Sequence, residues 1–310
     1  MDFTQMLTAA EADAPIVIDG GLGTALEERG VDLDHALWSA DLLRRRPEAI
    51  AEVHAAFAAA GARILTTASY QATPVGFARA AVPVAEGRDL IAAGVEVART
   101  AAEAVAGSTG AARALVAGSV GPFGAALGGG EEYTGDYRLT AAEYADFHHG
   151  RIAALAAAGV DLLAIETQPR LDEIRILVQL AEEVGLPAWL SVTLGDAGGL
   201  PDGSGLADLA EEASASAAVA AVGVNCVPPS AVAPALRALS AHTDLPLIAY
   251  PNSGERYAAE SMQWLPKTAE SGSDSWPVDE WTRLGARLIG GCCRTTPADI
   301  SVLSRASSPG

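Results

Sequence analysis

The sequence has little positive charge. Of its 310 residues, 20 are Lys or Arg and 39 are Asp or Glu, which gives a net charge of −19 at pH 7. Nucleic-acid binding needs a basic surface that neutralises phosphates, so this composition argues against nucleic acid as a partner. Lys267 is the single lysine and lies in a polar segment, which weakens any prediction of Schiff-base chemistry. The acidic field modestly favours cationic small molecules.

Long apolar runs and targeting segments are also lacking. The first residues, MDFTQMLTAAEADAP, are acidic where a signal peptide needs a basic start and an apolar run. The longest uncharged stretch, residues 213–236, contains Asn225 and three prolines, so a helix end, a strand and a loop fit it better than a membrane span. We therefore expect a cytoplasmic protein without membrane contact. Three cysteines do not make a disulfide scaffold.

Half of the residues are apolar, and they follow a regular pattern along the chain. Short apolar, β-rich runs alternate with alanine-rich stretches of helical character. The runs occupy residues 15–19, 63–69, 114–120, 161–167, 188–194, 221–227, 246–252 and 287–293. The helical stretches include residues 47–60, 87–106, 141–158 and 171–184. Continuous apolar runs are typical of parallel strands that are buried on both faces.

Eight strand–helix units predict an α/β fold of the (β/α)8 TIM-barrel type, with an open doubly wound sheet as the alternative. We expect one domain over residues 1–303 and a flexible C-terminal tail over residues 304–310. Two connections, 121–139 and 253–280, exceed the usual loop length and are expected to be lids or binding loops. We expect the five histidines to be surface or structural residues: His35, His54, His148, His149 and His242.

Polar and sulfur-containing residues gather where the predicted strands end. In chain order, they are Asp19, Gly20, Gly21, Thr67, Ser69, Tyr70, Glu166, Thr167, Asn225, Cys226, Asn252, Cys292 and Cys293. The C-terminal ends of barrel strands form one face, and that face carries the chemistry in barrel enzymes. We therefore expect these residues to surround one site.

All three cysteines belong to this group, on the sixth and eighth predicted strands. Closure of a barrel brings these strand ends to about 10 Å apart, close enough for three thiolates to share one ion. Vicinal side chains alternate in a regular strand, but Gly290 and Gly291 permit an irregular backbone that turns both sulfurs to one side. The alternatives are three buried small side chains or a redox disulfide.

Three thiolates on Zn²⁺ would leave one tetrahedral position open for a fourth, substrate thiolate. Zinc coordination deprotonates a thiol that is otherwise mostly protonated at neutral pH, which favours thiol alkylation. Asp19 and Glu166 could hold an ammonium group, and the N–H groups near Gly20 and Gly21 a carboxylate. For Asp19, a helix N-cap is an equal alternative. The pattern indicates an amino-acid thiol as substrate.

Several segments carry a resemblance to a known family. They are DGGLGTALEERG (19–30), LWSADLL (37–43), TTASYQAT (66–73), GEEYTGDY (130–137), GVNC (223–226), YPNSGE (250–255) and GGCCRTTPADI (290–300). The chain resembles the homocysteine S-methyltransferases, and within them the short enzymes that use S-methylmethionine or S-adenosylmethionine. The resemblance implies zinc on the cysteines and homocysteine sulfur as fourth ligand. It implies Asp19, Gly20, Gly21 and Glu166 around the amino-acid end, Asn225 and Asn252 in support, and Tyr70 near metal and donor.

The methyl donor of such an enzyme would carry a positive charge. Aromatic faces and acids attract a sulfonium or quaternary ammonium cation. Candidates for that role are Trp38, Phe123, Glu131, Glu132, Tyr133, Asp136 and Tyr137, although a solvated acidic loop is an equal reading. The family resemblance favours S-methylmethionine; a betaine-type or other thiol methyltransferase, a non-catalytic zinc- or thiol-binding barrel, and a lyase or aldolase with structural cysteines are the alternatives. We expect a monomer or a homodimer.

Overall fold

The computed structural model describes the chain except for residues 11–13, 34–38, 255, 259–262, 266–271 and 308–310. Its centre is an eight-stranded parallel sheet with the order β1-β10-β7-β6-β5-β4-β3-β2. The strands are β1 (Ile16–Val17), β2 (Ile64–Thr66), β3 (Leu115–Val120), β4 (Leu162–Gln168), β5 (Ala188–Val192), β6 (Val219–Asn225), β7 (Leu247–Tyr250) and β10 (Ala286–Ile289). A parallel bridge between Ile18 and Ile64 joins the two ends of this order. The predicted (β/α)8 barrel is confirmed, and the open sheet was the wrong alternative.

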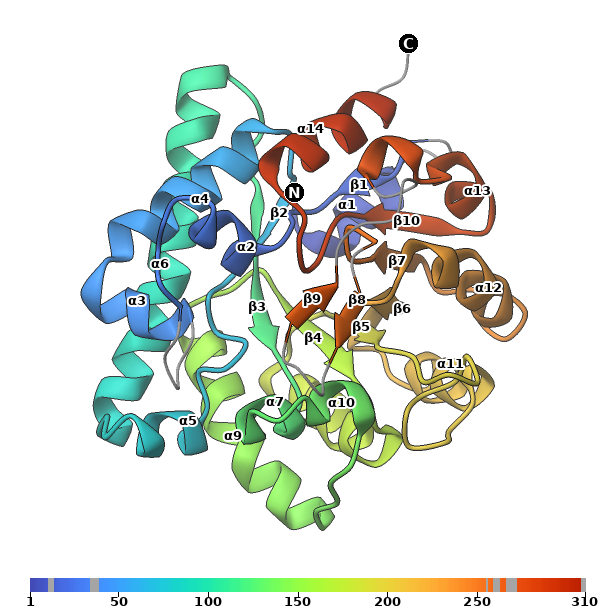
Figure 1. The fold of residues 1–310 in the computed structure, drawn as a ribbon, viewed down its shortest axis with the longest axis horizontal. Coiled ribbons are helices and arrows are strands. Elements are labelled where there is room, and N and C mark those ends of the chain that lie inside the picture. The colour runs from blue at the N-terminus through green and yellow to red at the C-terminus, as the bar shows by residue number, and fades with distance from the viewer. Residues whose placement is uncertain (11–13, 34–38, 255, 259–262, 266–271, 308–310) are drawn as a thin grey trace.

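Helices form a ring around the strands (Figure 1). They are α2 (Leu22–Glu27), α3 (Ser39–Arg45), α4 (Pro47–Ala59), α5 (Pro74–Arg79), α6 (Val84–Thr109), α9 (Ala141–Ala157), α10 (Leu171–Val184), α11 (Leu206–Ser214), α12 (Pro229–Ser240), α13 (Val278–Arg283) and α14 (Pro297–Ala306). The predicted helix at 171–184 has the observed bounds, and α9 begins with a capping box formed by Thr140 and Glu143. Helix α6 is longer than predicted at both ends. Position 87 within this helix is a glycine. A Cβ there would come within 2.6 Å of the Phe77 ring, so glycine permits this close approach.

The core has two parts. One lies between the strands and the outer helices, where residues such as Val116, Leu163 and Ile289 are fully buried. The other fills the barrel and includes Ile64 and Trp189. Helix α1 (Phe3–Ala9) belongs to this inner core through Phe3, Met6 and Leu7. It therefore closes the barrel at the N-terminal ends of the strands.

The two long connections contain secondary structure that the sequence analysis did not predict. Residues 121–139 include α7 (Phe123–Leu127) and α8 (Glu131–Thr134). Residues 253–280 include the antiparallel strands β8 (Arg256–Ala258) and β9 (Gln263–Leu265), the 3-10 helix η1 (Ser273–Ser275) and the start of α13. These short elements carry no hydrophobic periodicity, which explains why the pattern analysis missed them.

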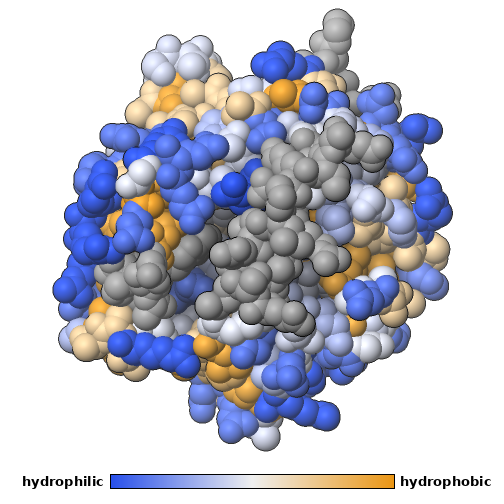
Figure 2. All heavy atoms as spheres, in the orientation of Figure 1, coloured by the Kyte–Doolittle hydropathy of each residue, from blue (hydrophilic) through white to orange (hydrophobic). Residues whose placement is uncertain are grey.

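Figure 2 shows hydrophilic residues around the periphery of one face. In the described part of the chain, no helix combines the length and apolar character needed to cross a membrane. Helix α14 runs to Ala306, past the boundary predicted at residue 303, so the extent of a tail stays a prediction.

Candidate active site at the barrel mouth

The barrel interior becomes polar toward the C-terminal ends of its strands. Side chains alternate along a strand, so every second residue faces the interior. Along these inward positions Ile64 is followed by Thr66, Ala117 by Ser119, Ala164 by Glu166, Trp189 by Ser191 and Ile248 by Tyr250. Apolar side chains thus fill the lower barrel, while hydroxyl and carboxyl groups face the mouth.

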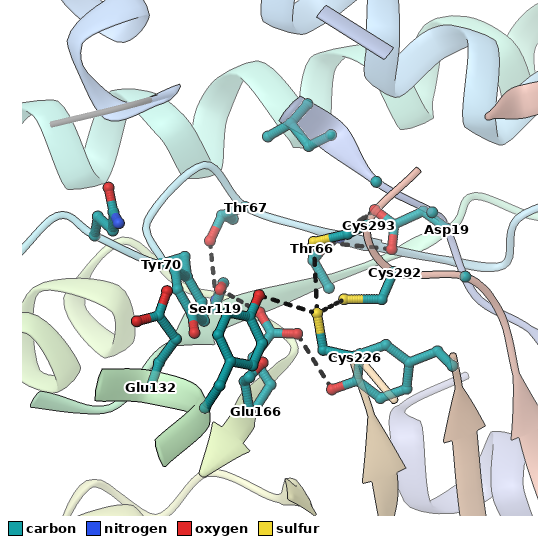
Figure 3. A pocket seen from close by; sticks show the side chains of 18 residues that line it. Asp19, Thr66, Thr67, Tyr70, Ser119, Glu132, Glu166, Cys226, Cys292 and Cys293 are labelled. Carbon is teal, nitrogen blue, oxygen red and sulfur yellow. Dashed lines mark hydrogen bonds between the residues drawn. The ribbon is translucent and has the colours of Figure 1, made fainter. Parts of the chain in front are cut away.

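A cavity of about 280 Å³ opens at this mouth. Its lining includes Asp19, Gly20, Gly21, Leu22, Thr66, Thr67, Tyr70, Gln71, Ser119, Glu132, Tyr133, Glu166, Thr167, Cys226, Tyr250, Gly291, Cys292 and Cys293. Figure 3 shows that the three cysteines lie on one side and that Tyr70 and Glu132 lie across from them. The cavity therefore brings together residues that are up to 274 positions apart in the sequence, such as Asp19 and Cys293.

The sulfur atoms of Cys226, Cys292 and Cys293 form a compact cluster. Cys226 Sγ lies 3.0 Å from Cys292 Sγ and 3.5 Å from Cys293 Sγ, and all three atoms lie within 4.8 Å of one another. A tetrahedral zinc site with Zn–S bonds of about 2.3 Å places its sulfurs about 3.8 Å apart. A disulfide needs about 2.05 Å, and the three cysteines are free. The cluster therefore has the dimensions of a thiolate metal site.

The backbone around Gly290 and Gly291 turns both vicinal sulfurs into the site. The strand ends at Ile289, and a Cβ on Gly290 would lie 2.3 Å from Ile18 Cγ1, so glycine permits this close approach to β1. Beyond it, the Cys292 N–H donates to Pro251 O and the Cys293 carbonyl accepts from Ser253 N–H. The chain has thus left the regular strand before the cysteines, and side-chain alternation no longer applies.

The thiols perturb one another electrostatically. Hydrogen bonds from the Cys226 and Cys292 thiols lower the pKa of the Cys293 thiol well below its ordinary value. The pKa of the Cys292 thiol is instead raised by its hydrogen bonds to the other two sulfurs and by burial. Further ionisation of neighbouring sulfurs requires a positive charge between them, because like charges oppose one another. This is the behaviour expected of a cation-binding set of ligands.

Asp19 and Glu166 are buried acids in the same cavity. Thr66 donates to the Asp19 carboxylate from its N–H at 2.7 Å and from its hydroxyl at 3.0 Å. Glu166 accepts hydrogen bonds from the hydroxyls of Ser119 and Tyr250. Burial raises the pKa of Asp19 to about 8 and that of Glu166 to about 7. Both carboxyl groups would regain an ordinary pKa beside a cation, so they are suited to an ammonium group.

Tyr70 and Glu132 lie across the cavity from the cysteines, and Tyr133, next to Glu132 on α8, reaches toward them. The Tyr133 hydroxyl lies 3.5 Å from Cys226 Sγ. Glu132 Oε2 is buried without a hydrogen-bond partner, and burial raises the pKa of this carboxyl group to about 7. A buried carboxylate oxygen without a partner is costly unless a ligand supplies one. The tyrosine rings and this acid are the features that attract an organic cation.

The remaining predicted site residues lie near the cysteines or at the cavity wall. Asn225 does not line the cavity; its side chain binds the Thr167 N–H and hydroxyl, and its Nδ2 lies 3.9 Å from Cys292 Sγ. Asn252 is buried beside the cysteine segment and also lies outside the lining. The Gly21 N–H, predicted to face a carboxylate, donates to Thr295 instead. Trp38 lies outside the described residues.

Four polar lining residues were missed as site residues: Thr66, Gln71, Ser119 and Tyr250. Thr66, Ser119 and Tyr250 occupy inward positions near strand ends, so counting alternation from Ile64, Ala117 and Ile248 would have found them. Gln71 follows the strand end by several residues, and no spacing rule identifies it.

Comparisons with known proteins agree with this geometry. Residues 16–307 match the family model described as homocysteine S-methyltransferase. The homocysteine S-methyltransferase of Escherichia coli K12 is 45% identical over 294 residues, covering 94% of this chain and 95% of its own. Homocysteine S-methyltransferase 4 of Zea mays is 41% identical over 308 residues, covering 96% and 90%. The crystal structure of the metallated form of the homocysteine methyltransferase MmuM from Escherichia coli superposes with a TM-score of 0.85 at 42% identity, covering 94% and 96%. The chain therefore belongs to the homocysteine S-methyltransferase family.

Proposed function

We propose that this protein methylates homocysteine on sulfur with a sulfonium donor, S-methylmethionine or S-adenosylmethionine, and that Zn²⁺ is the metal on its cysteines. The observation that carries the proposal is a cluster of three sulfurs within 4.8 Å that shares one cavity with two buried acids. A metal-bound thiol and an amino-acid ammonium group need these two features at a short distance from each other. Homocysteine has both groups on one small molecule.

Cys226, Cys292 and Cys293 would hold the zinc ion. Zinc bound by three thiolates carries a net charge of about −1, keeps a fourth position for a substrate thiol, and ionises that thiol without quenching its nucleophilicity. Asn225 supports this arrangement by donating toward Cys292 Sγ. The protein's part is to hold the acceptor sulfur at a fixed point of the cavity.

The acceptor's amino-acid end is assigned to Asp19 and Glu166. Their carboxylates would bind the ammonium group, while the carboxylate of homocysteine would lie along the backbone of Gly20 and Gly21, which lines the cavity. Asn252 stays a supporting residue beside the cysteine segment. This orientation directs the homocysteine thiol toward the three sulfurs.

The donor is assigned to the side of Tyr70, Glu132 and Tyr133. The homocysteine sulfur attacks the donor methyl carbon in line, the bond between that carbon and the sulfonium sulfur breaks, and the electron pair stays on the departing sulfur. The donor leaves as a neutral thioether, and the acceptor becomes methionine. No general base is needed once the thiol is ionised, so the rate depends on holding both reactants near attack distance.

A donor panel tests this function. S-methylmethionine, S-adenosylmethionine and betaine are each supplied with homocysteine to the zinc-loaded protein, and methionine is measured. We expect methionine with a sulfonium donor and little with betaine. Turnover with betaine alone would replace the proposed donor class, and zinc binding without turnover on any donor would favour a non-catalytic zinc-binding barrel.

The cysteine cluster is tested by Cys292→Ser. We expect this variant to lose both stoichiometric zinc and methionine formation, because a catalytic zinc site needs three protein ligands and only two cysteines remain. Circular dichroism should show a folded barrel, since Cys292 lies outside the regular strands. Full activity in the folded variant would contradict the metal assignment.

A further inference from the structure

A buried hydrogen-bonded cluster lies behind the donor side of the cavity. It consists of His148 and Arg151 on α9 and Glu173 on α10, each at most 1% exposed. His148 Nε2 lies 2.7 Å from Glu173 Oε1, and Arg151 Nη2 lies 2.8 Å from His148 Nδ1. Arginine always donates, so His148 accepts at Nδ1 and donates from Nε2 to the carboxylate. None of the three residues lines the cavity.

Arg151 connects this cluster to Tyr70. Its Nη1 donates to the Tyr70 carbonyl at 2.7 Å, and its Nη2 donates to the Gly121 carbonyl at 2.6 Å. Gly121 is also the residue on which the Tyr70 ring lies, because a Cβ there would come within 2.6 Å of that ring. One guanidinium group therefore fixes the backbone on both sides of the contact that places Tyr70 in the cavity.

Glu173 connects the same cluster to the segment that carries Glu132 and Tyr133. Its Oε1 accepts from the Phe123 N–H at 2.6 Å, and its Oε2 accepts from the Tyr137 hydroxyl at 2.5 Å. Phe123 begins α7, and Tyr137 follows α8. A single buried carboxylate thus holds both ends of the segment from residue 123 to residue 137.

The cluster is electrically balanced and acts as a unit. Glu173 and Arg151 carry opposite charges, with His148 between them, and removing one partner would leave an uncompensated buried charge. The homocysteine side is held by different bonds, from Thr66 to Asp19 and from Ser119 and Tyr250 to Glu166. The cluster's direct bonds therefore reach the donor side of the cavity.

We propose that His148, Arg151 and Glu173 are positioning residues that set the affinity for the methyl donor by holding Tyr70 and the α7–α8 segment against the cavity. The inference rests on the proposed function for its donor. The positioning role therefore falls to side chains of α9 and α10 that do not line the cavity.

Arg151→Lys and Tyr137→Phe test this proposal. Arg151→Lys removes the guanidinium group that donates to both the Tyr70 and the Gly121 carbonyl. Tyr137→Phe removes one hydrogen bond to Glu173 and leaves the three residues of the buried cluster unchanged. Arg113→Lys is the matched control, because Arg113 donates to the Ala114 carbonyl and pairs with Asp161 at 3.2 Å, near the starts of β3 and β4. Two readouts are compared: donor and homocysteine KM values, and amide hydrogen exchange of residues 121–137.

We expect both test variants to raise the donor KM about tenfold, with homocysteine KM and zinc content unchanged, because displacing Tyr70 and the α7–α8 segment weakens their contacts with the donor, and a loss of about 1.4 kcal/mol is a factor of ten. Exchange in residues 121–137 should accelerate in these variants and not in Arg113→Lys. An unchanged donor KM, or an equal rise of both KM values with faster exchange throughout the barrel, would overturn the proposal. If the wild-type protein used no donor, the proposed function would fail, and unchanged exchange would still overturn the positioning role on its own.

Discussion

At the scale of single residues, Glu132 combines a place in the cavity lining with a buried carboxylate oxygen that has no hydrogen-bond partner. Its buried Oε2 has no partner, and it faces a cavity that already holds Asp19 and Glu166. We expect Glu132→Gln to raise the KM for a sulfonium donor about tenfold, since charge-assisted contacts of this kind contribute about 1.5–3 kcal/mol. The KM for homocysteine should not change.

Glu131→Gln is the matched control for that variant. Glu131 is the neighbouring acid on α8 and accepts from the Gly129 N–H, but it does not line the cavity. Initial rates at varied donor concentration distinguish the two variants. Equal donor KM values for Glu132→Gln and the wild-type protein would remove Glu132 from the donor site.

The two acids on the homocysteine side predict proton release on binding. Burial raises the pKa of Asp19 to about 8 and that of Glu166 to about 7, so both are partly protonated near pH 7 without ligand. A bound ammonium group favours the ionised forms and lowers both pKa values. Affinity for the ammonium group should therefore increase as pH rises from 6 to 8, with protons released.

A ligand without sulfur isolates this effect from ionisation of the thiol. Binding of 2-aminobutyrate is measured by calorimetry at pH 7 in two buffers of different ionisation enthalpy, which gives the number of protons exchanged. We expect release in the wild-type protein and less release in Asp19→Asn. Proton uptake, or none exchanged, would show that these acids do not meet the ammonium group.

At the scale of elements, strand and helix positions follow from the sequence better than the connections do. The run at 161–167 predicts β4 and the pattern at 171–184 predicts α10, because apolar periodicity reports burial directly. The same counting places Ser119 and Tyr250 inside the barrel. The carbonyl contacts of Arg151 and the approach of Gly290 to β1 depend on tertiary packing, which no local pattern encodes.

The short N-terminal helix shows the same limit. Asp2 and Gln5 form a capping box on α1, a signature that is readable in the sequence. The packing of this helix into the bottom of the barrel depends on the closed arrangement of the eight strands, which the local sequence does not encode. The cysteine cluster could be predicted from the sequence because the strand order alone brings these strand ends together.

Helix α4 contains a buried histidine with a predictable effect on stability. His54 is fully buried, neither ring nitrogen has a partner, and burial lowers its pKa to about 4. The unfolded chain binds a proton near pH 6.5 and the folded chain does not, so stability falls as pH drops from 6.5 toward 4. This loss amounts to about 2–3 kcal/mol at pH 4.5.

His54→Leu should remove that part of the acid sensitivity. Urea unfolding at pH 7 and pH 4.5 gives the change in unfolding free energy for wild-type and variant proteins. The same substitution at His149, which is exposed on α9, is the control. Identical pH dependence of His54→Leu and the wild-type protein would show that His54 is not held neutral by the fold.

At the scale of the whole molecule, the residues that line the cavity and the α1 residues that stabilise the inner core lie at opposite ends of the barrel. The cavity with the cysteines lies at the C-terminal ends of the strands, and α1 packs into the interior from the other end. Phe3 is fully buried, and its ring packs against Trp189 with centroids 6.3 Å apart. The apolar lower barrel lies between the two ends. The contacts of α1 should therefore affect the cavity only by stabilising the folded protein.

Phe3→Ala tests this separation. Truncating a buried phenylalanine costs about 3–5 kcal/mol, so the urea midpoint should fall clearly. Below the transition, zinc content and both KM values should equal those of the wild-type protein, because the altered side chain lies at the opposite end of the barrel. Val84→Ala, at a position 71% exposed, is the control and should leave the midpoint unchanged. A raised KM in folded Phe3→Ala would mean that the inner core transmits packing changes to the mouth, and the two ends could no longer be treated as independent.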